Sequence, residues 1–510
     1  LSRDRFWGTP IPVWRCRSCG HDECVGSVER LSELSGRDLT GLDLHRPYVD
    51  DVVVSCPECK GRAFRVDPVL DAWFDSGSMP AAQLHYPFER ADEFPNRFPA
   101  DFICEAIDQT RGWFYSLLAV NTLVFERAPY RNVVCLAHIV DQDGVKMSKS
   151  RGNVIDPWSV LSTRGAEALR WYMFSSGSPW TPKRVFLDAI DESTKLLRTL
   201  WNTVSFFVTY ANLDGWEPTN NHASSAPTHV LDRWILSRLD GTTDAVTDAL
   251  ANFDALAGAQ AIGALVDDLS NWYVRRSRPR FWTSADPAAH ATLHECLVTI
   301  SLLLAPFCPF LADELHRILT TASGAAEELL QSEHVSEIGA ERAGECSERP
   351  DAPGGASAAS GGGHESVHLL DWPEVGSSRV DRELEAEMDT ARVVTSLGRS
   401  ARADAKLGVR QPLARAIVSL PAGTELRADV THEVESELNV KRLEPVDSLE
   451  GLLTYHVVPN FKALGPRVGK LLPALKTVLA DLDGNEVQRT LADAGSLRVS
   501  VDGTEIELGP

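Results

Sequence analysis

The stretch IVDQDGVKMSKS at residues 139–150 carries the strongest signal for the fold of this chain. Residues 139–145 have the pattern of a strand that enters an Asp-Gly turn. Lys146 and Lys149 follow, separated by two residues and flanked by hydroxyl side chains. Mobile ammonium groups on a glycine-flanked loop suit a triphosphate, whose developing negative charge needs nearby cations. The alternative is a solvated basic turn, which is the ordinary interpretation of an arbitrary pair of lysines at this spacing.

The residues before this stretch alternate between strand and helix patterns from about 66 to 155. Residues 102–104 form a compact apolar run, residues 111–125 have an amphipathic pattern, and residues 132–137 form a second apolar run. Apolar strands separated by a helix are typical of a parallel sheet with helices on its faces. The sequence therefore predicts an α/β domain that includes the lysine stretch.

Two Cys-x-x-Cys pairs lie in the turn-rich residues 1–65, and their members are Cys16, Cys19, Cys56 and Cys59. In a chain of this size such pairs indicate metal ligands before disulfides. Four thiolates satisfy a tetrahedral Zn²⁺ and leave no open position, so the predicted role is structural. His21 and Cys24 are possible substitute ligands. The alternative is a set of reduced thiols that has lost its metal.

The rest of the chain is mainly helical by periodicity. Residues 302–319 have the pattern of a strongly apolar helix that is interrupted by Pro306 and Pro309, which should start or kink it. Residues 321–365 are rich in Ala, Gly, Ser and Glu and indicate a flexible acidic insertion. A long helix follows, with one predicted apolar face made of Leu384, Met388, Ala391, Val394, Leu397 and Ala401. A small α/β unit is predicted at the end: a strand near 416–420, a helix near 424–438 and a strand near 440–446.

The charge balance is strongly acidic, with 50 Lys+Arg against 72 Asp+Glu and a net charge of -22. Only ten of the 50 basic residues are lysine. A salt-adapted cytoplasm and a genome that prefers arginine codons both explain this composition. Net charge affects solubility and steering, and a local basic face can still bind phosphate. The first residues lack a signal-peptide layout, and no uninterrupted apolar run spans a bilayer, so a cytoplasmic protein without a membrane partner is expected.

The chain resembles the isoleucyl-tRNA synthetases of class I, of the archaeal and eukaryotic type. The whole pentapeptide matches the nucleotide loop of class I synthetases, and its members are Lys146, Met147, Ser148, Lys149 and Ser150. Residues 1–14, 71–89, 101–116, 131–160 and 267–282 carry the likeness further. The strings WFDSGSMP at 73–80 and DQTRGWF at 108–114 favour the isoleucine enzymes over the valine and leucine enzymes.

The resemblance implies a multidomain fold: the C-terminal part of a Rossmann-type catalytic domain with a zinc knuckle, a helical anticodon-binding bundle and a small C-terminal α/β unit. The expected parts are a zinc-knuckle module at 1–65, the catalytic half-domain with the lysine loop at 66–155, a connecting helical region that contacts the tRNA stem at 156–225, the anticodon-binding domain at 226–320, the insertion at 321–365, a helical continuation at 366–415 and a truncated α/β domain at 416–510.

The resemblance also implies roles for individual residues. Lys146 and Lys149 would be catalytic and would stabilise the leaving pyrophosphate, with Mg²⁺ accompanying ATP. Glu105, Asp108 and Gln109 would contact the aminoacyl-adenylate, and Trp73 and Trp113 would form walls of the isoleucine pocket. Two indoles offer the rigid apolar surface that a branched alkyl group needs. Ala106 departs from the expected glycine and puts the approach to the adenylate in doubt.

Residues 272–282 mix arginines with aromatics at a helix end, and the resemblance places them in the domain that grips the anticodon stem. Arg275, Arg276 and Arg278 are the candidate tRNA contacts, because guanidinium groups neutralise phosphates and aromatics stack on bases. The alternative is a bundle corner in which these arginines pair with Asp267 and Asp268. The implied partners are ATP, L-isoleucine and tRNA(Ile), and the protein is expected to be a monomer.

Two elements of the family are missing from these 510 residues. None of the 14 histidines lies in an HxGH arrangement, and no editing site is recognisable, although an apolar pocket alone rejects valine by only about 1–3 kcal/mol. The expectation is a C-terminal fragment that is inactive alone as an isoleucine–tRNA ligase. The alternatives are a split enzyme, a non-catalytic tRNA-binding or scaffold protein, and a valyl- or leucyl-type synthetase.

Overall fold

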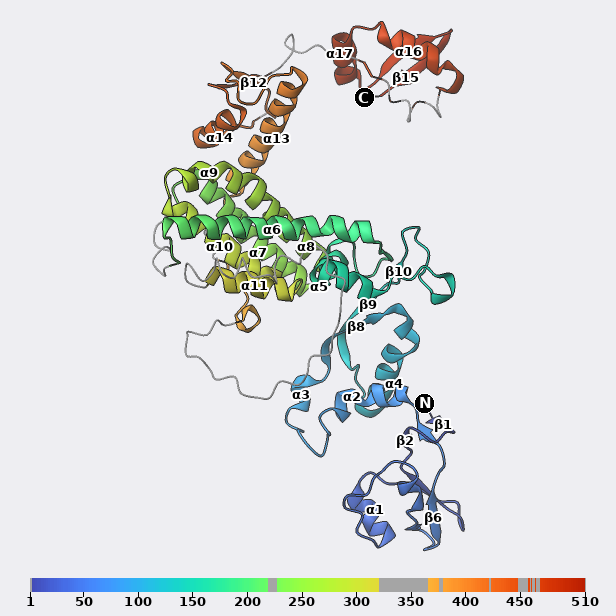
Figure 1. Cartoon of the computed structure of the whole chain (residues 1–510). Coiled ribbons are helices and arrows are strands. Elements are labelled where there is room, and N and C mark those ends of the chain that lie inside the picture. The colour runs from blue at the N-terminus through green and yellow to red at the C-terminus, as the bar shows by residue number, and fades with distance from the viewer. Residues whose placement is uncertain are drawn as a thin grey trace. The chain divides into compact units, whose positions relative to one another are not determined.

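The structure is a computed structural model. It describes residues 2–218, 227–320, 366–375, 379–421, 423–447, 457, 458, 460, 464 and 468–509, and of Lys149, Lys470, Ala492 and Asp493 it describes only the backbone. The chain divides into two compact units, and Figure 1 shows its helices and strands. Unit 1 comprises Leu1–Ser225 and Leu239–Ser377, and unit 2 comprises Ala226–Arg238 and Ser378–Pro510. The acidic insertion predicted at 321–365 lies outside the described residues.

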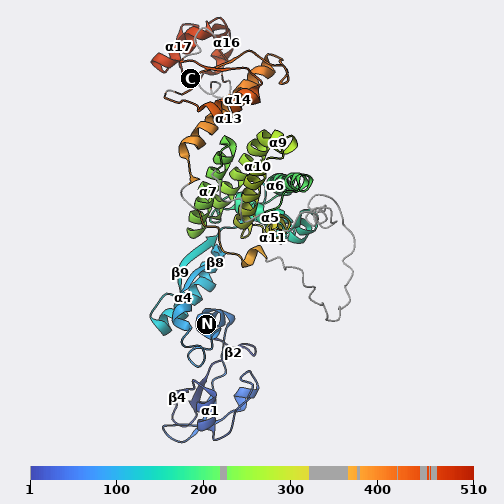
Figure 2. The ribbon, with the colours of Figure 1, turned by 90° about the vertical axis from the view of Figure 1, so that its left-hand side faces the viewer.

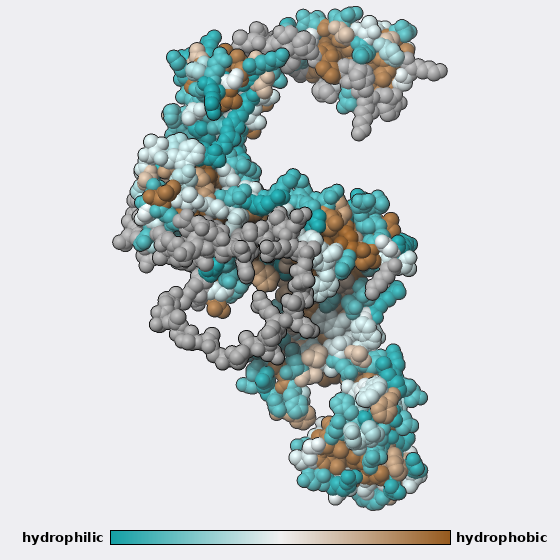
Figure 3. Space-filling view, in the orientation of Figure 1, coloured by the Kyte–Doolittle hydropathy of each residue, from teal (hydrophilic) through white to brown (hydrophobic). Residues whose placement is uncertain are grey.

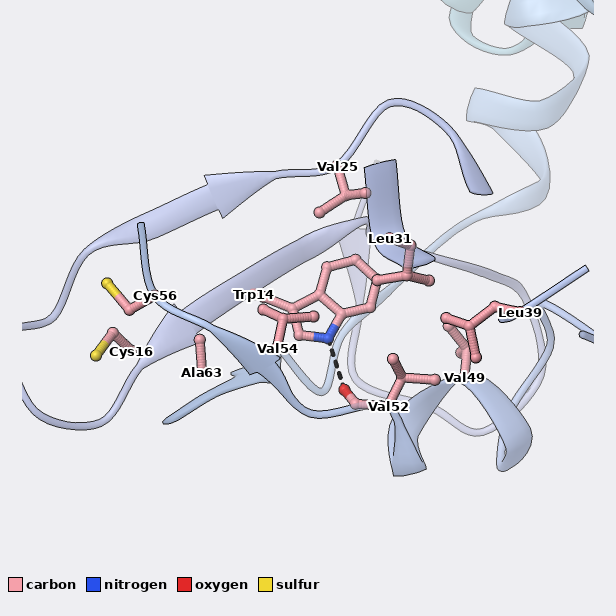
Figure 4. Close-up of a cluster of buried hydrophobic side chains, with 10 residues drawn as sticks. All are labelled: Trp14, Cys16, Val25, Leu31, Leu39, Val49, Val52, Val54, Cys56 and Ala63. Carbon is pink, nitrogen blue, oxygen red and sulfur yellow. Dashed lines mark hydrogen bonds between the residues drawn. The ribbon is translucent and has the colours of Figure 1, made fainter. Parts of the chain in front are cut away.

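Unit 1 begins with a small module built around a four-stranded antiparallel sheet of order β4-β3-β6-β5. Its elements are β3 (Val13–Cys16), β4 (Asp22–Cys24), α1 (Val28–Ser35), η1 (Tyr48–Asp51), β5 (Val54–Ser55) and β6 (Arg62–Arg65). Side chains alternate along β3, so Trp14 and Cys16 both point into the core. Trp14 is 2% exposed, and its indole N–H donates to the carbonyl of Val52 at 2.8 Å (Figure 4). This buried hydrogen bond orients the largest side chain of the module.

The α/β part of unit 1 contains the parallel strand pair that the sequence predicts. A three-stranded sheet of β1 (Ser2–Arg3), β7 (Val69–Leu70) and β2 (Thr9–Pro10) precedes it. The next elements are α2 (Ala72–Ala82), α3 (Phe94–Arg97), β8 (Ala100–Ala106), η2 (Ile107–Arg111), α4 (Trp113–Phe125) and β9 (Tyr130–Leu136). Strands β8 and β9 pair in parallel from Ala100↔Tyr130 to Ala106↔Leu136, and they lie side by side in Figures 1 and 2. Helix α4 supplies the long crossover that a parallel pair needs.

The lysine stretch leads into a group of helices. The elements are β10 (Ile139–Val140), η3 (Lys149–Arg151), α5 (Pro157–Ser175), β11 (Lys183–Arg184), α6 (Leu187–Asp214), α7 (Val230–Ala251), α8 (Ala255–Asp267), the π-helical turn η5 (Asp268–Val274), α9 (Arg275–Trp282), α10 (Pro287–Leu304), α11 (Pro309–Thr320) and η7 (Val367–Leu369). The apolar stretch 302–319 is interrupted at its prolines as predicted, but it belongs to two helices: α10 ends at Leu304 and α11 begins at Pro309. Proline lacks the N–H that a helix interior needs, but it fits the first turn of a new helix.

One helix among the described residues, α10, is long and apolar enough to cross a membrane. Of its 18 residues, 56% are buried inside the molecule. A buried core helix passes the same test of length and composition, so the finding is weak evidence for a membrane span.

Unit 2 contains the small α/β unit predicted near the end of the sequence. Its elements are α13 (Arg382–Asp404), β12 (Ala416–Val418), α14 (Ala428–Leu438), β13 (Leu443–Pro445), η9 (Gly469–Leu471), α16 (Leu472–Ala480), α17 (Gly484–Ala494), β14 (Leu497–Val501) and β15 (Thr504–Leu508). Strands β12 and β13 pair in parallel around α14, whereas β14 and β15 form an antiparallel hairpin. Leu475, Leu479 and Val501 belong to a separate apolar cluster that the hairpin and α16 share.

The predicted apolar face of α13 is right in its first half and wrong in its second. Leu384, Met388 and Ala391 are fully buried, but Leu397 is 65% exposed and Ala401 is also exposed. The buried stripe keeps the helical period and continues through Thr395 and Arg402, with the half-buried Gly398 between them. Gly398 is needed because a Cβ there would lie 2.7 Å from Leu438 of α14. The close approach of α14, and not side-chain hydrophobicity, selects the residues on this half of the helix.

Arg402 is the buried polar centre of this part of unit 2, with 4% of its surface exposed. Its guanidinium donates to the carbonyls of Gly408 (3.0 Å), Gln411 (3.0 Å), Leu438 (2.8 Å) and Asn439 (3.2 Å). Two of these acceptors lie at the end of α14, and the other two lie in the loop after α13. One side chain therefore connects the C-terminal ends of both helices.

We expect Arg402→Ala to lower the free energy of unfolding of unit 2 by about 3 kcal/mol, because it leaves four carbonyls without their donor. Hydrogen exchange of the amides around 407–413 and 439–443 measures this loss. Arg498→Ala, an exposed arginine on β14, is the matched control and should change the stability by less than about 0.5 kcal/mol. Equal exchange rates in the two variants would contradict the role of Arg402.

Candidate functional site

The four predicted cysteines converge in the N-terminal module. Their Sγ atoms all lie within 4.8 Å of one another, with 3.5 Å between Cys16 and Cys59 and 3.7 Å between Cys19 and Cys56. Tetrahedral Zn–S bonds of 2.3 Å place the sulfurs ~3.8 Å apart, so the four thiols fit that geometry. Figure 4 shows Cys16 and Cys56 at one end of the apolar core. The cluster is compatible with a structural metal.

The two Cys-x-x-Cys turns have the same backbone hydrogen bonds. The N–H of Cys16 donates to His21 and that of Cys56 to Gly61, both at 2.8 Å, and each turn contains a left-handed residue, Gly20 or Lys60. Gly61 also needs to lack a side chain, because a Cβ there would lie 3.1 Å from the Cys59 sulfur. Each Cys-x-x-Cys pair therefore forms its own turn.

Backbone N–H groups and neighbouring thiols change the ionisation of the cluster. The N–H groups of Cys19 and Ser18 lower the pKa of Cys16 to about 6. The N–H of His21 lowers the pKa of Cys19, but the thiols of Cys59, Cys16 and Cys56 and burial outweigh it and raise that pKa to about 12. Four thiolates this close repel one another, and a bound cation is what would let them ionise together.

The substitute ligands predicted from the sequence do not join this cluster. The His21 Nε2 lies 3.5 Å from a Glu23 carboxylate oxygen, and Cys24 is an exposed free thiol. The group of possible ligands found among the described residues consists of the four paired cysteines.

The lysine loop is held by a side-chain frame that the sequence analysis missed. Asp141 accepts hydrogen bonds from the N–H groups of Asp143 (3.1 Å) and Val145 (2.8 Å), and Gly144 takes the left-handed conformation of the predicted turn (φ 81°). Asn153 donates to the other Asp141 oxygen at 2.7 Å and accepts from the Ser148 N–H at 2.9 Å. Asn153 therefore joins both ends of the loop. In the sequence, its position shortly after the two lysines was the only feature that could have indicated this role.

Of the two predicted catalytic lysines, Lys146 is exposed on this loop. Its Nζ lies 3.5 Å from the Nε2 of His138, a residue to which the sequence analysis gave no role. The side chain of Lys149 lies outside the described residues, and its backbone begins η3. The hydroxyls of Ser148 and Ser150 lie 3.2 Å apart.

The predicted adenylate-binding residues follow the carboxyl end of the neighbouring strand. Glu105 is exposed near the end of β8, and Asp108 and Gln109 lie in η2 directly after it. Since β8 and β9 are parallel neighbours, this segment and the segment from His138 to the lysine loop leave the same edge of the strand pair. The carboxyl edge of a parallel sheet is where α/β domains hold ligands. Ala106 has a φ of -76°, so its backbone does not need the glycine that we expected there.

Close packing of α2 against α4 brings the two predicted pocket tryptophans together. Trp113 donates its indole N–H to the carbonyl of Ser76 at 3.4 Å. Trp73 lies over Gly112, where a Cβ would be 2.8 Å from the indole ring. The Gln109 side chain accepts from the N–H of Trp113 at 2.9 Å and so caps the start of α4. Gly112 is thus required by the position of Trp73, and 44% of Trp73 is exposed.

The three predicted RNA-contacting arginines lie together on α9. Arg278 is exposed and stacks over Trp282 at 5.7 Å, and Trp282 is itself exposed. Burial, together with the charges of Arg276 and Arg278, lowers the pKa of Arg275. Arg280 lies on the same helix and pairs with Asp286 at 2.8 Å, an aspartate that the predicted bundle corner did not include. Helix α9 therefore places guanidinium groups next to an exposed indole.

We expect Asn153→Ala to open the lysine loop. The hydrogen bond from Asn153 is the first cause of the lowered pKa of Asp141, so the pKa of Asp141 should rise toward its ordinary value. An aspartate with a lowered pKa contributes stability above its unfolded pKa and loses it as the pH falls through the folded value. In the variant this contribution should be smaller, and its loss should be complete at a higher pH.

Limited trypsin digestion after Lys146, Lys149 and Arg151 measures the opening. Ser150→Ala removes only the contact between the Ser150 and Ser148 hydroxyls, and it serves as the control that should keep the original cleavage rate. Unchanged cleavage in Asn153→Ala would show that Asn153 does not hold the loop.

Two protein-family models match the chain. The model for class I tRNA synthetases (I, L, M and V) matches residues 1–181, and the model for the anticodon-binding domain of tRNA ligases matches residues 232–418. The first match includes the strand pair, the lysine loop and the cysteine cluster, and the second includes α9 and α13.

Among solved structures, the chain is similar to a leucyl-tRNA synthetase of Agrobacterium radiobacter K84 in a ternary complex with tRNA and LeuAMS. The TM-score is 0.48 at 20% identity, over 74% of this chain and 42% of that chain. This likeness is too weak to support an argument about the fold.

Curated relatives are similar over the whole chain. Proteins named isoleucine–tRNA ligase are 44% identical in Thermobifida fusca, 41% in Clostridium acetobutylicum and 43% in Streptomyces avermitilis. In each case the match covers 100% of this chain but only 45–46% of the relative, so the chain spans about half their length. All three relatives are bacterial, and the archaeal and eukaryotic subtype stays a prediction. Residues 1–181 thus match the class I tRNA synthetases, residues 232–418 match the anticodon-binding domain of tRNA ligases, and the chain is similar throughout to proteins named isoleucine–tRNA ligase.

Proposed function

We propose that this chain supplies the lysine-loop half of the active site of an isoleucine–tRNA ligase. The reaction joins isoleucine to the α-phosphate of ATP with release of pyrophosphate, and then transfers the isoleucyl group to tRNA(Ile). The observation that carries the proposal is the placement of the segment 105–109 and the lysine loop at one edge of the β8–β9 pair. Similarity to isoleucine–tRNA ligases over the whole chain supports the choice of amino acid.

The chemistry needs positioning and charge stabilisation more than covalent catalysis. Lys146 and Lys149 would contact the β- and γ-phosphates, and Mg²⁺ bound with ATP would neutralise part of their charge. Glu105, Asp108 and Gln109 would orient the adenylate, and the indoles of Trp73 and Trp113 would bind the branched side chain. The frame made by Asp141 and Asn153 would return the lysines to the same position in each turnover.

The helical part would hold the tRNA. Arg275, Arg276 and Arg278 lie on α9, within the segment that the anticodon-binding model matches. Guanidiniums beside the exposed Trp282 suit phosphates together with an unpaired base. A monomer that remains in the cytoplasm is the simplest assembly for this role.

We also assign structural zinc to the four cysteines. Their sulfur geometry fits a tetrahedral ion, and the apolar core that contains Trp14 and Val52 adjoins Cys16 and Cys56. Zinc would keep the four thiols together as thiolates and would thereby stabilise the module; it would not act in catalysis.

We expect one zinc ion per chain by elemental analysis. Cys16→Ser should abolish zinc binding and destabilise the N-terminal module, because a ligand bond is lost. Cys24→Ser removes a thiol outside the cluster and should retain full zinc content. A metal-free chain with an intact module, or equal zinc loss in both variants, would reject the assignment.

Isoleucine-dependent exchange of pyrophosphate with ATP tests the activity. We expect little exchange with this chain alone and restored exchange when it is combined with the preceding half of an isoleucine–tRNA ligase. In that mixture Lys146→Ala and Lys149→Ala should each lower the rate about 100-fold or more, because each removes a cation at the developing charge.

Lys195→Ala is the matched control for this experiment, since Lys195 is an exposed lysine on α6 that pairs with Glu192. It should leave the exchange rate unchanged. Absence of exchange in the mixture, or full exchange without the loop lysines, would contradict the proposed function.

A further inference from the structure

In unit 2, helix α13 ends with a lysine at a position that glycine usually occupies. The N–H of Lys406 donates to Ala403 at 3.0 Å and that of Leu407 donates to Arg402 at 2.8 Å, which is the Schellman arrangement. Lys406 is its left-handed residue, with a φ of 56°. This conformation costs a residue with a Cβ about 1 kcal/mol, and Lys406 is exposed, so packing does not explain its side chain.

The loop after this lysine is held from beneath. Arg402 donates to the carbonyls of Gly408 and Gln411 at 3.0 Å each, and the side-chain amide of Asn439 donates to the carbonyl of Val409 at 3.1 Å. The N–H of Lys441 donates to Leu413 at 3.0 Å. The loop of residues 406–412 and the turn of residues 439–442 therefore form one preorganised surface (orange in Figure 1).

This surface is basic in a chain that is otherwise acidic. We call it the basic face, and its five cations, all exposed, are Lys406, Arg410, Arg415, Lys441 and Arg442. The segments 404–415 and 439–444 contain two carboxylates, Asp404 and Glu444, whereas the whole chain has 50 Lys+Arg and 72 Asp+Glu. Figure 3 shows a largely hydrophilic surface over α13.

Three of the five cations are available for a ligand. Glu444 accepts from Arg442 at 2.8 Å and Arg415 at 3.0 Å, which lowers the pKa of Glu444 and leaves one net positive charge there. Within the described part of the chain, no carboxylate lies within ion-pair distance of Lys406, Arg410 or Lys441. The C-terminal end of α14 carries the partial negative charge of its dipole, and Arg402 offsets it through Leu438 and Asn439. That helix end therefore does not cancel the positive charge of the basic face.

The geometry points to the basic face as a second RNA-binding surface, which contacts the phosphate backbone of the tRNA through Lys406, Arg410 and Lys441. This inference rests on the proposed function and extends it to residues outside α9. Lys406 and Arg410 lie within the segment matched by the anticodon-binding model. The two segments contain no aromatic residue, so the face can bind phosphates but offers no ring on which a base could stack.

Two other anionic partners fit the observations less well. A membrane surface calls for an apolar face that enters the lipid, and Val409 is the only large apolar side chain exposed in the loop 406–412. An acidic protein partner would also need apolar anchor residues on this surface, because such anchors supply most of the affinity of protein–protein interfaces. A rigid loop with separated cations instead matches a regularly spaced phosphate chain.

Binding of a tRNA(Ile) transcript to the chain at salt concentrations from about 50 to 200 mM tests the inference. The combined variant Lys406→Gly, Arg410→Ala, Lys441→Ala should bind about tenfold or more weakly at the low end, and its logarithmic salt dependence should be shallower by about 2. Lys406→Gly alone should weaken binding while it preserves or raises the stability of unit 2, because glycine suits the left-handed position. If Lys406→Gly binds tRNA more weakly but is equally stable, the lysine contacts the RNA and its effect is not caused by unfolding.

Arg498→Ala and Lys195→Ala, two exposed cations elsewhere, are the controls and should bind as the unaltered chain does. The pair Arg275→Ala, Arg276→Ala reports on the proposed α9 contact. If that pair weakens binding and the combined variant does not, the basic face is overturned while the proposed function stands.

Two further outcomes also overturn the inference. If the unaltered chain binds no tRNA, both the basic face and the proposed tRNA contact fail. If the combined variant loses affinity for phosphatidylserine vesicles but keeps its affinity for tRNA, the partner is a membrane surface and the assignment to RNA is wrong.

Discussion

Parallel strands cannot be joined by a tight turn, so β8 and β9 need the whole of α4 between them. That requirement places the ends of both strands at the same edge and releases two polar segments side by side. One segment holds Glu105, and the other leads to the lysine loop. The rest of the candidate site depends on this pairing, because a shift in register would separate the two segments before any side chain could act.

Close backbone approach then determines where the side chains at this edge lie. Gly112 allows Trp73 to lie on the start of α4, and Gly77 brings α2 to the backbone of Ser116, where a Cβ would be 2.8 Å from its carbonyl. The buried Asn121 donates to the carbonyl of Gly77 at 2.7 Å and holds the same approach. These contacts give Trp73 and Trp113 a defined position before any ligand is present.

Local patterns predicted the parts of this structure that depend on neighbouring residues. The apolar runs around β8 and β9, the Asp-Gly turn and the paired cysteines were all visible in the sequence, and the structure confirms the parallel pairing and the cysteine cluster. Asn153 and Arg402 were not predicted, because their roles depend on hydrogen bonds that only the folded backbone brings about: Asn153 bonds the Asp141 side chain and the Ser148 N–H, and Arg402 bonds four carbonyls. Leu397 was placed on the wrong face of α13 for the same reason, since Gly398 and the approach of Leu438 decide that packing.

The distribution of charge follows a related logic. A net charge of -22 repels nucleic acid in general, so the proposed RNA binding would have to come from a few cations that lie away from carboxylates. In unit 2 the guanidinium of the buried Arg402 donates hydrogen bonds to backbone carbonyls, and it supports the loop that carries Lys406 and Arg410. An acidic surface with small, preorganised basic areas lowers non-specific binding while it retains contacts at defined positions. The same buried side chain thus stabilises the fold and sets the geometry of the charges above it.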